Sequence, residues 1–201
     1  MTNIVNYAKN PSFEVNVTDD WTLITDGAGT RTRDAAQYKV GSYSCRLDLV
    51  GAGTYTYIRG NTELSIPNNG TVTLSVWARA DSAPAPESIW VRIIDPDVAT
   101  KASVYGTVAA NGAWERLTVS WTNTSGVAVG VTADLINYYL DNSTHVWFDA
   151  CQLELASAAS AYTDGAQGEG HSWAGGAHNS VSTWTEPASV GFVTVIPYMM
   201  V

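Results

Sequence analysis

Residues 71–79 read Thr-Val-Thr-Leu-Ser-Val-Trp-Ala-Arg and alternate polar or charged with apolar side chains, except at Trp77. Successive side chains of a β-strand point to opposite faces, so the four small apolar residues of this stretch share one face. We expect that face to lie in a core, with Trp77 and Arg79 on the opposite side. The stretch therefore predicts a strand of a sheet that has one buried and one outer face.

The same arrangement recurs in residues 88–94, where Trp90 and Arg92 lie opposite a row of isoleucine and valine. In residues 54–59, Tyr55 and Tyr57 share one face in the same manner. Sugar rings stack their C–H faces on aromatic planes, and arginine donates paired hydrogen bonds to hydroxyl groups. Six residues are therefore candidates for glycan binding: Trp77, Arg79, Trp90, Arg92, Tyr55 and Tyr57. The alternative is that loops or another subunit cover these faces.

Alternation with a period of two continues along most of the chain, and clusters of Gly, Pro, Asn and Asp interrupt it. No segment keeps a helical period over three turns. The strands expected are Ser44–Val50, Thr54–Arg59, Thr71–Arg79, Ser88–Ile94, Trp114–Thr122, Gly130–Tyr138 and His145–Leu155. The pattern predicts an all-β protein, with a two-sheet antiparallel β-sandwich of the jelly-roll type and a C-terminal β extension.

Charge and composition exclude several classes of partner. Ten Lys and Arg against 19 Asp and Glu give a net charge of −9, so nucleic acid and anionic membranes are not expected partners. No basic N-terminal region precedes an apolar run, and no stretch of about 18 apolar residues occurs. We expect a product that is neither exported by a signal peptide nor inserted in a membrane.

The two cysteines, Cys45 and Cys151, both fall in predicted strands. They are expected to be buried free thiols or to form one long-range disulfide, and their spacing excludes a CxxC motif.

Near Tyr162 the sequence changes to a Gly-rich stretch, and an apolar tail follows after Val190. We expect a jelly-roll domain over residues 1–163 and a linker with an assembly segment over residues 164–201. Such a tail needs a partner, either by strand addition or in a symmetric trimer, because an unpaired apolar strand is costly in water. The alternative is that it folds back as an edge strand of its own sandwich.

Three segments, in order along the chain, resemble the carbohydrate-binding jelly-roll modules attached to xylanases and glucanases. They are Tyr7–Glu14, followed by Trp21; Gly41–Leu47; and Val146–Glu154. The resemblance covers roughly residues 6–156 and implies a structural Ca²⁺ that joins the N-terminal segment to the closing strand. Glu14 and Asp149 match the acidic ligands, and a backbone carbonyl near Lys39 or Gly41 would complete an oxygen shell. The alternative is an acidic pair without an ion.

The C-terminal part resembles the virion proteins of tailed bacteriophages, especially minor tail and receptor-binding proteins. The segments concerned are Asp149–Glu154, Ala161–Gly165 and the series Trp173, Gly175, His178, Ser180 and Ser182. The resemblance implies a structural or adhesion protein of the tail or particle surface, assembled in the host cytoplasm. Its expected partners are other virion proteins, further copies of itself and a host cell-surface glycan. The alternatives are a free-standing carbohydrate-binding module, a capsid decoration protein and a glycoside hydrolase.

The sequence lacks the common catalytic motifs. There is no nucleophile elbow, P-loop, dinucleotide-binding pattern or HExxH motif. His171 and His178 have no acidic partner at ligand spacing, and His145 begins a predicted strand. A glycosidase needs two facing carboxylates, for which Glu87, Asp95, Asp97 and Asp134 are available, but nothing singles out a pair. We therefore expect a protein that is not an enzyme.

Overall fold

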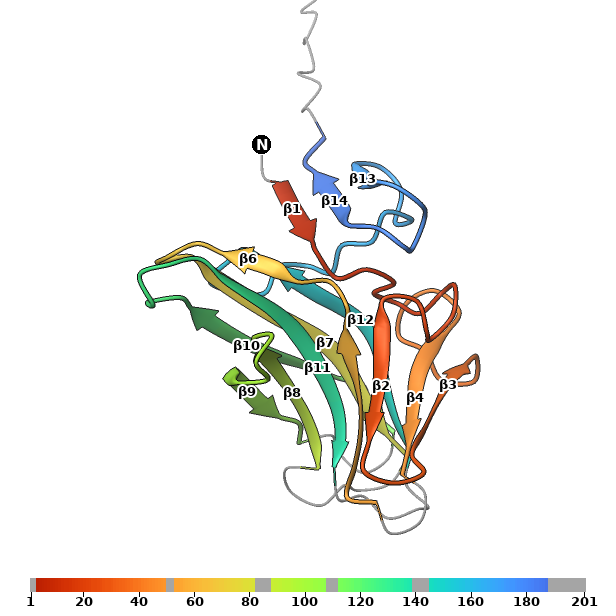
Figure 1. Ribbon diagram of the computed structural model, residues 1–201. Helices are drawn as coiled ribbons and strands as arrows, with labels where there is room; N and C mark the ends of the chain where they lie inside the picture. The colour runs from red at the N-terminus through yellow and green to blue at the C-terminus, as the bar shows by residue number, and fades with distance from the viewer. Residues whose placement is uncertain (1–2, 50–52, 82–87, 108–111, 139–144, 188–201) are drawn as a thin grey trace, which may run out of the picture.

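The computed structural model describes residues 3–49, 53–81, 88–107, 112–138 and 145–187. These residues form fourteen β-strands. Two larger antiparallel sheets face each other and a small third sheet lies at one end (Figure 1). The expected all-β sandwich is confirmed. Within the described ranges no helix is long and apolar enough to cross a membrane.

The first large sheet has five strands and is called the β7 sheet. Its order is β10 (Glu115–Thr122), β7 (Thr71–Ala80), β12 (His145–Glu154), β4 (Ser44–Asp48) and β3 (Thr30–Asp34). The second sheet has six strands and is called the β11 sheet. Its order is β2 (Trp21–Thr25), β5 (Tyr55–Gly60), β11 (Val129–Tyr138), β8 (Ile89–Ile94) and β9 (Thr100–Tyr105), with β6 (Leu64–Ile66) also paired to β11.

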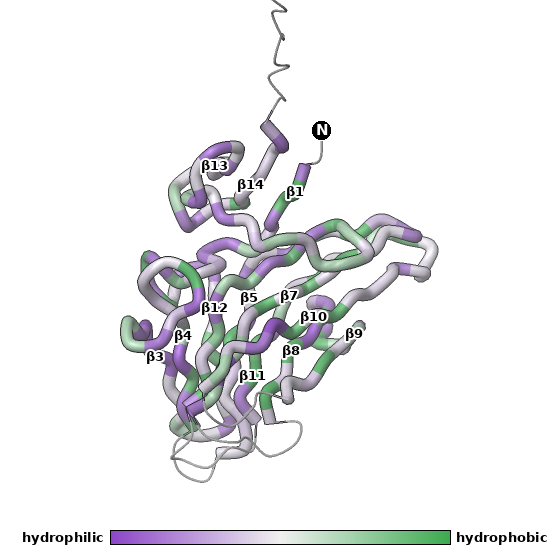
Figure 2. The backbone as a smooth tube through the Cα atoms, turned by 180° about the vertical axis from the view of Figure 1, so that it is seen from behind, coloured by the Kyte–Doolittle hydropathy of each residue, from purple (hydrophilic) through white to green (hydrophobic). Residues whose placement is uncertain are grey.

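The core lies between these two sheets and follows the predicted alternation. Val72, Leu74 and Val76 of β7 are fully buried, as are Val91 and Ile93 of β8. The hydropathy colouring in Figure 2 shows apolar and polar positions interleaved along the strands, as expected when one face of each sheet is buried. Burial of these side chains is the main term that stabilises the sandwich.

Cys45 and Cys151 are both free and fully buried in this core. Burial in an apolar environment raises the pKa of both thiols far above the ordinary value. The structure therefore agrees with the free-thiol alternative, in which cysteine packs as a small apolar residue.

A β-bulge interrupts β12 where it pairs with β7, between Asp149 and Gln152. Ala150 has a positive φ of 51° at this point. The inserted residue keeps Cys151 in the core, because without it the alternation that buries Phe148 would turn Cys151 outward. Bulges re-aim neighbouring side chains, and this one sets the position of Asp149.

The third sheet, called the terminal sheet, joins the two ends of the described chain. Its order is β1 (Asn3–Asn6), β14 (Ser182–Thr185) and β13 (His171–Trp173). The buried Asn6 anchors it, since its Nδ2 donates to the carbonyl oxygens of Cys151 and Thr163 at 2.9 and 3.2 Å. Strand β14 thus pairs with β1 and β13 pairs with β14, and neither joins an edge of the sandwich (Figure 1).

The Gly-rich stretch that was expected to act as a flexible linker forms turns in the structure. Gly168 and Gly170 have positive φ angles of 99° and 79°. The Gly170 carbonyl accepts a hydrogen bond of 2.9 Å from the Thr185 N–H, which holds the turn against β14. The apolar tail after Val190 lies outside the described residues.

Candidate functional site

One row of side chains crosses the outer face of the β11 sheet. The strand register places Ile24, Tyr57, Ile136, Trp90 and Tyr105 opposite one another on β2, β5, β11, β8 and β9. Tyr57 and Trp90 are half-buried, whereas Ile136 between them is 2% exposed. The row therefore has an aliphatic floor with an aromatic ring on either side of it.

We call this surface the aromatic face and define it by Tyr55, Tyr57, Trp90, Tyr105, Ile136, Arg59, Arg92 and Asp134. The Trp90 and Tyr105 rings stack, with centroids 5.4 Å apart and planes 26° from parallel. Tyr55 and Tyr57 are tilted, with centroids 5.6 Å apart. Strands in a sheet are about 4.8 Å apart, so the Tyr57 and Trp90 backbones are separated by roughly 10 Å.

The neighbouring row on the same face is charged. Arg59 donates from Nε and Nη2 to the two carboxylate oxygens of Asp134, at 2.8 and 2.9 Å. Arg92 donates from Nε and Nη2 to Asp134 Oδ2, at 2.8 and 2.7 Å. The Asp134 side chain is 0% exposed, so both of its ion pairs are shielded from water.

The guanidinium groups also lie beside the aromatic rings. Arg92 Cζ is 4.9 Å from the Trp90 ring centroid and 5.6 Å from that of Tyr57, and Arg59 Cζ is 5.6 Å from the Tyr57 centroid. Such distances permit cation–π attraction. Burial, with a smaller contribution from the Asp134 charge, raises the pKa of the Tyr57 hydroxyl. That hydroxyl therefore stays protonated at neutral pH and can donate a hydrogen bond.

The structure brings together four of the six predicted glycan-binding residues and separates the other two. Trp77 and Arg79 lie on the outer face of the β7 sheet, on the far side of the sandwich. Lys39 Nζ lies 4.0 Å from the Trp77 ring centroid and caps that ring. Arg79 donates to the Gly112 carbonyl and lies 5.9 Å from the ring of Trp147.

The two predicted metal ligands meet on one loop. Asp149 Oδ2 accepts hydrogen bonds from the backbone N–H groups of Lys39 and Val40, at 2.6 and 2.8 Å. Glu14 Oε1 accepts from the N–H groups of Ser42 and Tyr43, at 2.8 and 3.0 Å. Asp149 therefore holds the first half of the loop of residues 39–43, and Glu14 holds its second half.

The loop needs glycine at position 41. Gly41 has a φ of 70°, and a Cβ atom there would lie 2.2 Å from Glu14 Oε1. Any larger side chain would displace the carboxylate.

Burial raises the pKa of Asp149 to about 7, with a further contribution from the Glu14 charge. No arginine or lysine in the described part of the chain lies within ion-pairing distance of either carboxylate. Both carboxylates already accept backbone N–H bonds but have no cationic partner, and carboxylate oxygens are donors that a hard cation such as Ca²⁺ prefers, so the chemistry of these two residues fits the ion that the resemblance implies.

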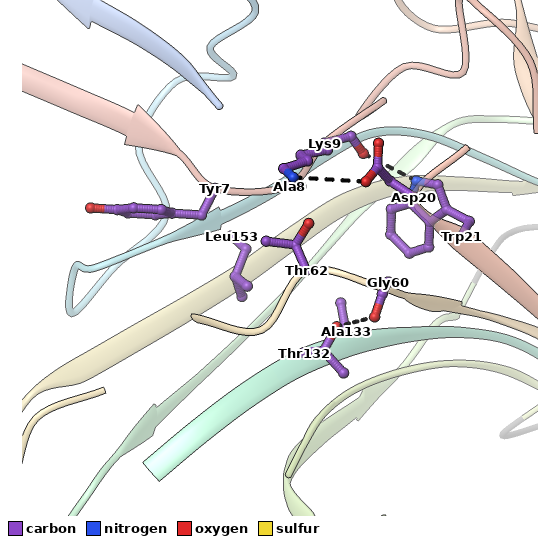
Figure 3. Close-up of a pocket in the computed structure, with 10 residues that line it drawn as sticks. All are labelled: Tyr7, Ala8, Lys9, Asp20, Trp21, Gly60, Thr62, Thr132, Ala133 and Leu153. Atoms are coloured by element: carbon purple, nitrogen blue, oxygen red, sulfur yellow. Dashed lines mark hydrogen bonds and ion pairs between the residues drawn. The ribbon is translucent and has the colours of Figure 1, made fainter. Parts of the chain in front are cut away.

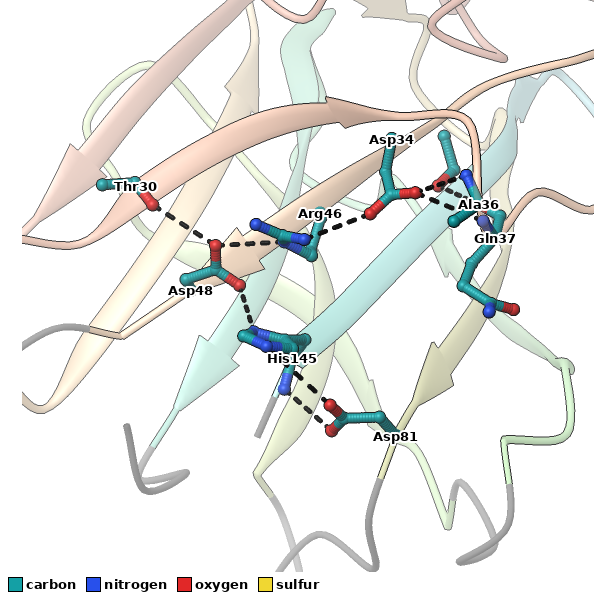
Figure 4. A network of polar contacts seen from close by, with 9 residues as sticks. Thr30, Asp34, Ala36, Gln37, Arg46, Asp48, Asp81 and His145 are labelled. Atoms are coloured by element: carbon teal, nitrogen blue, oxygen red, sulfur yellow. Dashed lines mark hydrogen bonds and ion pairs between the residues drawn. The ribbon is translucent and has the colours of Figure 1, made fainter. Parts of the chain in front are cut away.

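A second polar network lies at the opposite end of the β7 sheet from the terminal sheet (Figure 4). Arg46 pairs with Asp34 and Asp48 at 3.2 and 3.1 Å. His145 Nδ1 is 2.6 Å from Asp48, and its Nε2 is 3.9 Å from Asp81. Each carboxylate of the network therefore has a cationic or imidazole partner.

The remaining acids considered for catalysis do not form a facing pair in the described residues. Asp134 is saturated by two arginines, and Asp95 pairs with Lys101 at 2.6 Å while it caps a turn through the Ala99 N–H. Asp97 is exposed on that turn, and Glu87 lies outside the described residues.

Three hollows in the described structure are lined by no residue of the aromatic face. A recess of about 10 Å³ is lined by Tyr7, Trp21, Gly60 and the Lys9–Asp20 ion pair, among others (Figure 3). It has room for about one water molecule and for no sugar. Two hollows of about 340 Å³ flank β1, one beside Trp184 and Tyr162 and the other beside Glu154. The aromatic face is instead an open sheet surface.

Four members of the aromatic face were not among the predicted glycan-binding residues: Arg59, Tyr105, Ile136 and Asp134. Ile136 lies on β11, whose outward-facing residues were not assigned from the sequence. Tyr105 lies on β9, a strand that was not predicted. Asp134 was considered only as a catalytic acid. Its partners are 75 and 42 residues away in the chain, so pairing was invisible without the sheet register.

Solved structures share the fold at low sequence identity. An arabinose-bound α-L-arabinofuranosidase, MgGH51, matches with a TM-score of 0.57 at 10% identity over 75% of this chain and 26% of that one. The module TmCBM61, in complex with β-1,4-galactotriose, matches with a TM-score of 0.54 at 16% identity over 74% of this chain and 97% of the module. The structure of the enzymatically active domain of bacteriophage CBA120 tailspike protein 4 matches with a TM-score of 0.54 at 15% identity.

The last match covers 75% of this chain and 21% of the tailspike. This chain thus spans about a quarter of the arabinofuranosidase and a fifth of the tailspike, but nearly the whole of the isolated module. At these identities the likeness shows the fold alone.

Sequence comparison assigns the family. No curated protein matches the chain. The family profile of the carbohydrate binding domain CBM_4_9, however, matches residues 5–133, which is more than half of the chain and includes β5 and β8 of the aromatic face. The chain belongs to the carbohydrate binding domain family CBM_4_9.

Proposed function

We propose that this protein binds a glycan chain on the aromatic face of the β11 sheet. The observation that carries the proposal is the register that sets Tyr57 and Trp90 on either side of Ile136, on an open face of a domain of this family. An aromatic ring offers a flat apolar surface to the C–H face of a sugar, with polar groups at its edge for the hydroxyls. The Tyr57 hydroxyl is one such group.

The opposite face is the weaker candidate. Lys39 Nζ lies 4.0 Å from the Trp77 ring centroid, closer than Arg92 Cζ lies to that of Trp90 at 4.9 Å, and Trp147 is 5% exposed.

A glycan array followed by calorimetry tests the proposal. We expect at least one oligosaccharide to bind the wild-type protein, and the Trp90→Ala and Tyr57→Ala variants to lose that binding while keeping the wild-type melting temperature to within a few degrees. The matched control is Trp77→Ala, an equally large truncation on the other outer face. An array without any bound glycan, or binding that survives both changes, contradicts the proposal.

We propose that the role is binding and not hydrolysis. Asp134, the one buried carboxylate on the aromatic face, is held by two arginines and has no free oxygen for a water or a glycosidic oxygen. A reducing-end assay on polysaccharides checks this: release of reducing ends that one Asp or Glu substitution abolishes would show an enzyme.

We propose further that the protein acts in the tail or on the surface of a bacteriophage virion, together with other virion proteins and as a homo-oligomer. The resemblance of the C-terminal segments supports this, and the tailspike match adds a related fold from a phage. A free-standing carbohydrate-binding module fits the family equally well. Mass spectrometry of purified particles distinguishes the two, since only a virion protein would be found in intact particles.

We also propose that Ca²⁺ binds between Glu14 and Asp149. The ion would supply the positive charge that the buried Asp149 lacks, and it would fix the loop of residues 39–43 against the bulge in β12. Because an ion that binds only the folded state stabilises it by mass action, the expected effect is on stability.

A further inference from the structure

The two arginines of the aromatic face use part of their hydrogen-bond donors inside the protein. Arg59 uses Nε and Nη2 on Asp134, and Arg92 uses Nε and Nη2 on the same carboxylate. One forked pair of donors of each arginine is therefore used on Asp134, while N–H groups on Nη1 remain, of which that of Arg92 lies 3.4 Å from Thr100 Oγ1. Each arginine brings a positive charge and these remaining donors to whatever binds on this face.

That charge is not balanced. Two guanidinium groups share one carboxylate, which leaves one net positive charge within the group. The Asp134 side chain is 0% exposed, whereas those of Arg59 and Arg92 are 20% and 14% exposed. The Asp134 charge therefore lies beneath the surface, whereas the two guanidinium charges are partly exposed at the surface.

The position of this charge is central to the face. Arg92 Cζ lies within 6 Å of both the Tyr57 and the Trp90 ring centroids, at 5.6 and 4.9 Å. A sugar stacked on either ring would come close to the guanidinium group.

Two other acidic residues of the described chain lie near the face, and neither is paired with Arg59 or Arg92. Asp95 and Lys101 neutralise each other beyond the end of β8, at 2.6 Å. Asp26 is exposed at the end of β2, where it accepts hydrogen bonds from the N–H groups of Thr54 and Tyr55. The protein as a whole carries −9, so a positive centre on its binding face runs against its general charge.

We infer that the aromatic face selects a glycan that carries an anionic group, a carboxylate or a phosphate, over the neutral glycan of the same backbone. The inference rests on the proposed function. The anion would lie over Arg59 and Arg92 while a sugar ring of the same chain stacks on Tyr57 or Trp90. The charge-assisted contact with a guanidinium is stronger than one between neutral groups.

Matched pairs of oligosaccharides test the inference by calorimetry. The pairs are a cello-oligosaccharide and its C6-oxidised form, a β-1,4-manno-oligosaccharide and the β-1,4-mannuronate of the same length, and a xylo-oligosaccharide with and without a glucuronic acid branch. The neutral glycan that binds most tightly on the array and its oxidised form complete the set. A C6-phosphorylated cello-oligosaccharide separates phosphate from carboxylate.

We expect the acidic member of at least one pair to bind about tenfold more tightly at 20 mM salt, and the ratio to fall towards one at 500 mM salt. Arg92→Gln and Arg59→Gln each make the group neutral and should abolish the preference. Asp134→Asn leaves two uncompensated guanidinium groups and should increase it. Arg79→Gln, on the opposite face, should leave the ratio unchanged.

The outcomes distinguish failure of the anion preference from failure of glycan binding itself. Equal affinities within every pair that binds, or a preference that persists in Arg92→Gln and Arg59→Gln, overturn this inference and leave the proposed function standing. No binding by any member of any pair, together with a blank array, overturns the proposed function and this inference with it. The salt dependence is measured on the wild-type protein, so it decides the matter even if a variant does not fold.

Discussion

Trp77 and Trp90 occupy matching positions on β7 and β8, two strands that follow each other in the chain, yet they lie on opposite outer faces of the sandwich. Each strand buries its small apolar residues and turns its tryptophan outward. Because β7 and β8 belong to the two facing sheets, their outward side chains point to opposite sides of the sandwich. Trp77 consequently lies beside Lys39 and, in register, next to Asp149, whereas Trp90 lies beside Arg92 and Tyr105.

We predict a difference in glycan affinity between the two tryptophans. Trp90→Ala should weaken binding by about tenfold or more, because a stacked ring at the centre of a binding face contributes heavily to affinity. Trp77→Ala should change the affinity by less than about twofold. Titration calorimetry with one oligosaccharide measures both, and equal losses would place the site elsewhere.

We predict that calcium stabilises the folded state. A chelator should lower the melting temperature of the wild-type protein, and added Ca²⁺ should restore it, since the ion binds the folded state. Asp149→Asn should remove this sensitivity by deleting a charged ligand. Differential scanning calorimetry measures the shift. A control with Mg²⁺ tests selectivity, and a melting curve that is the same with and without chelator rules the site out.

We predict unequal roles for two aromatic residues of the β7 sheet. Phe148 is 0% exposed in the core, so Phe148→Ala should lower the free energy of unfolding by about 3–5 kcal/mol. Trp121 packs against the core but is only half-buried, so Trp121→Ala should cost less than about 3 kcal/mol. Urea denaturation measures both values, and the reverse order would show that the burial pattern is misassigned.

We predict that neither cysteine reacts in the folded protein. Burial raises the pKa of both thiols, so at pH 8 almost no reactive thiolate is present and the reagent has no access. A thiol reagent should label no cysteine in buffer and both in denaturant without reductant. Labelling in buffer would reveal local opening, and no labelling in denaturant would reveal a disulfide.

We predict that the sandwich folds without the C-terminal strands. A chain ending at Asp164 loses the partner of β1 but no strand of either large sheet, so it should remain folded with a lower melting temperature. A chain ending at Pro187 keeps the terminal sheet and should melt as the full chain does.

The association state of the same two chains tests the assembly role. If the apolar tail mediates assembly, light scattering should show both shortened chains as monomers and the full chain as an oligomer. Unfolding of the chain that ends at Asp164 would show that the terminal sheet belongs to the folding unit, and identical association of all three chains would contradict the assembly role.

The sequence predicted the long strands and the direction of their side chains. Alternation along the ten residues of β7 or the six of β8 is long enough to favour a strand over a helix. The short strands β6 and β13, of three residues each, carry no such signal, and their existence depends on the strands they pair with. The bulge at Ala150 was also invisible, because an inserted residue shifts the alternation without any residue type that marks it.

The candidate site could be predicted only in part for the same reason. Alternation along each strand assigns Tyr57 and Trp90 to outer faces. It does not show whether the two strands belong to the same sheet and so share one outer face. The pairing of Asp134 with Arg59 and Arg92 needs three strands in register, and only the folded sheet supplies that. Glu14 and Asp149 were assigned through a family resemblance, since 135 residues of chain separate them and no spacing rule connects them.

The pairing of Asn3 with Thr185 has a mechanical consequence. The two ends of the described chain leave the terminal sheet at the same end of the β1–β14 ladder, so a pulling force on both ends would unzip the ladder one residue pair at a time instead of shearing it. The terminal sheet would yield first and release slack, while the sandwich below it carries no load until that sheet is open. A domain tethered in this way would respond to a pulling force by opening its terminal sheet, without deforming the surface on which the aromatic rings lie.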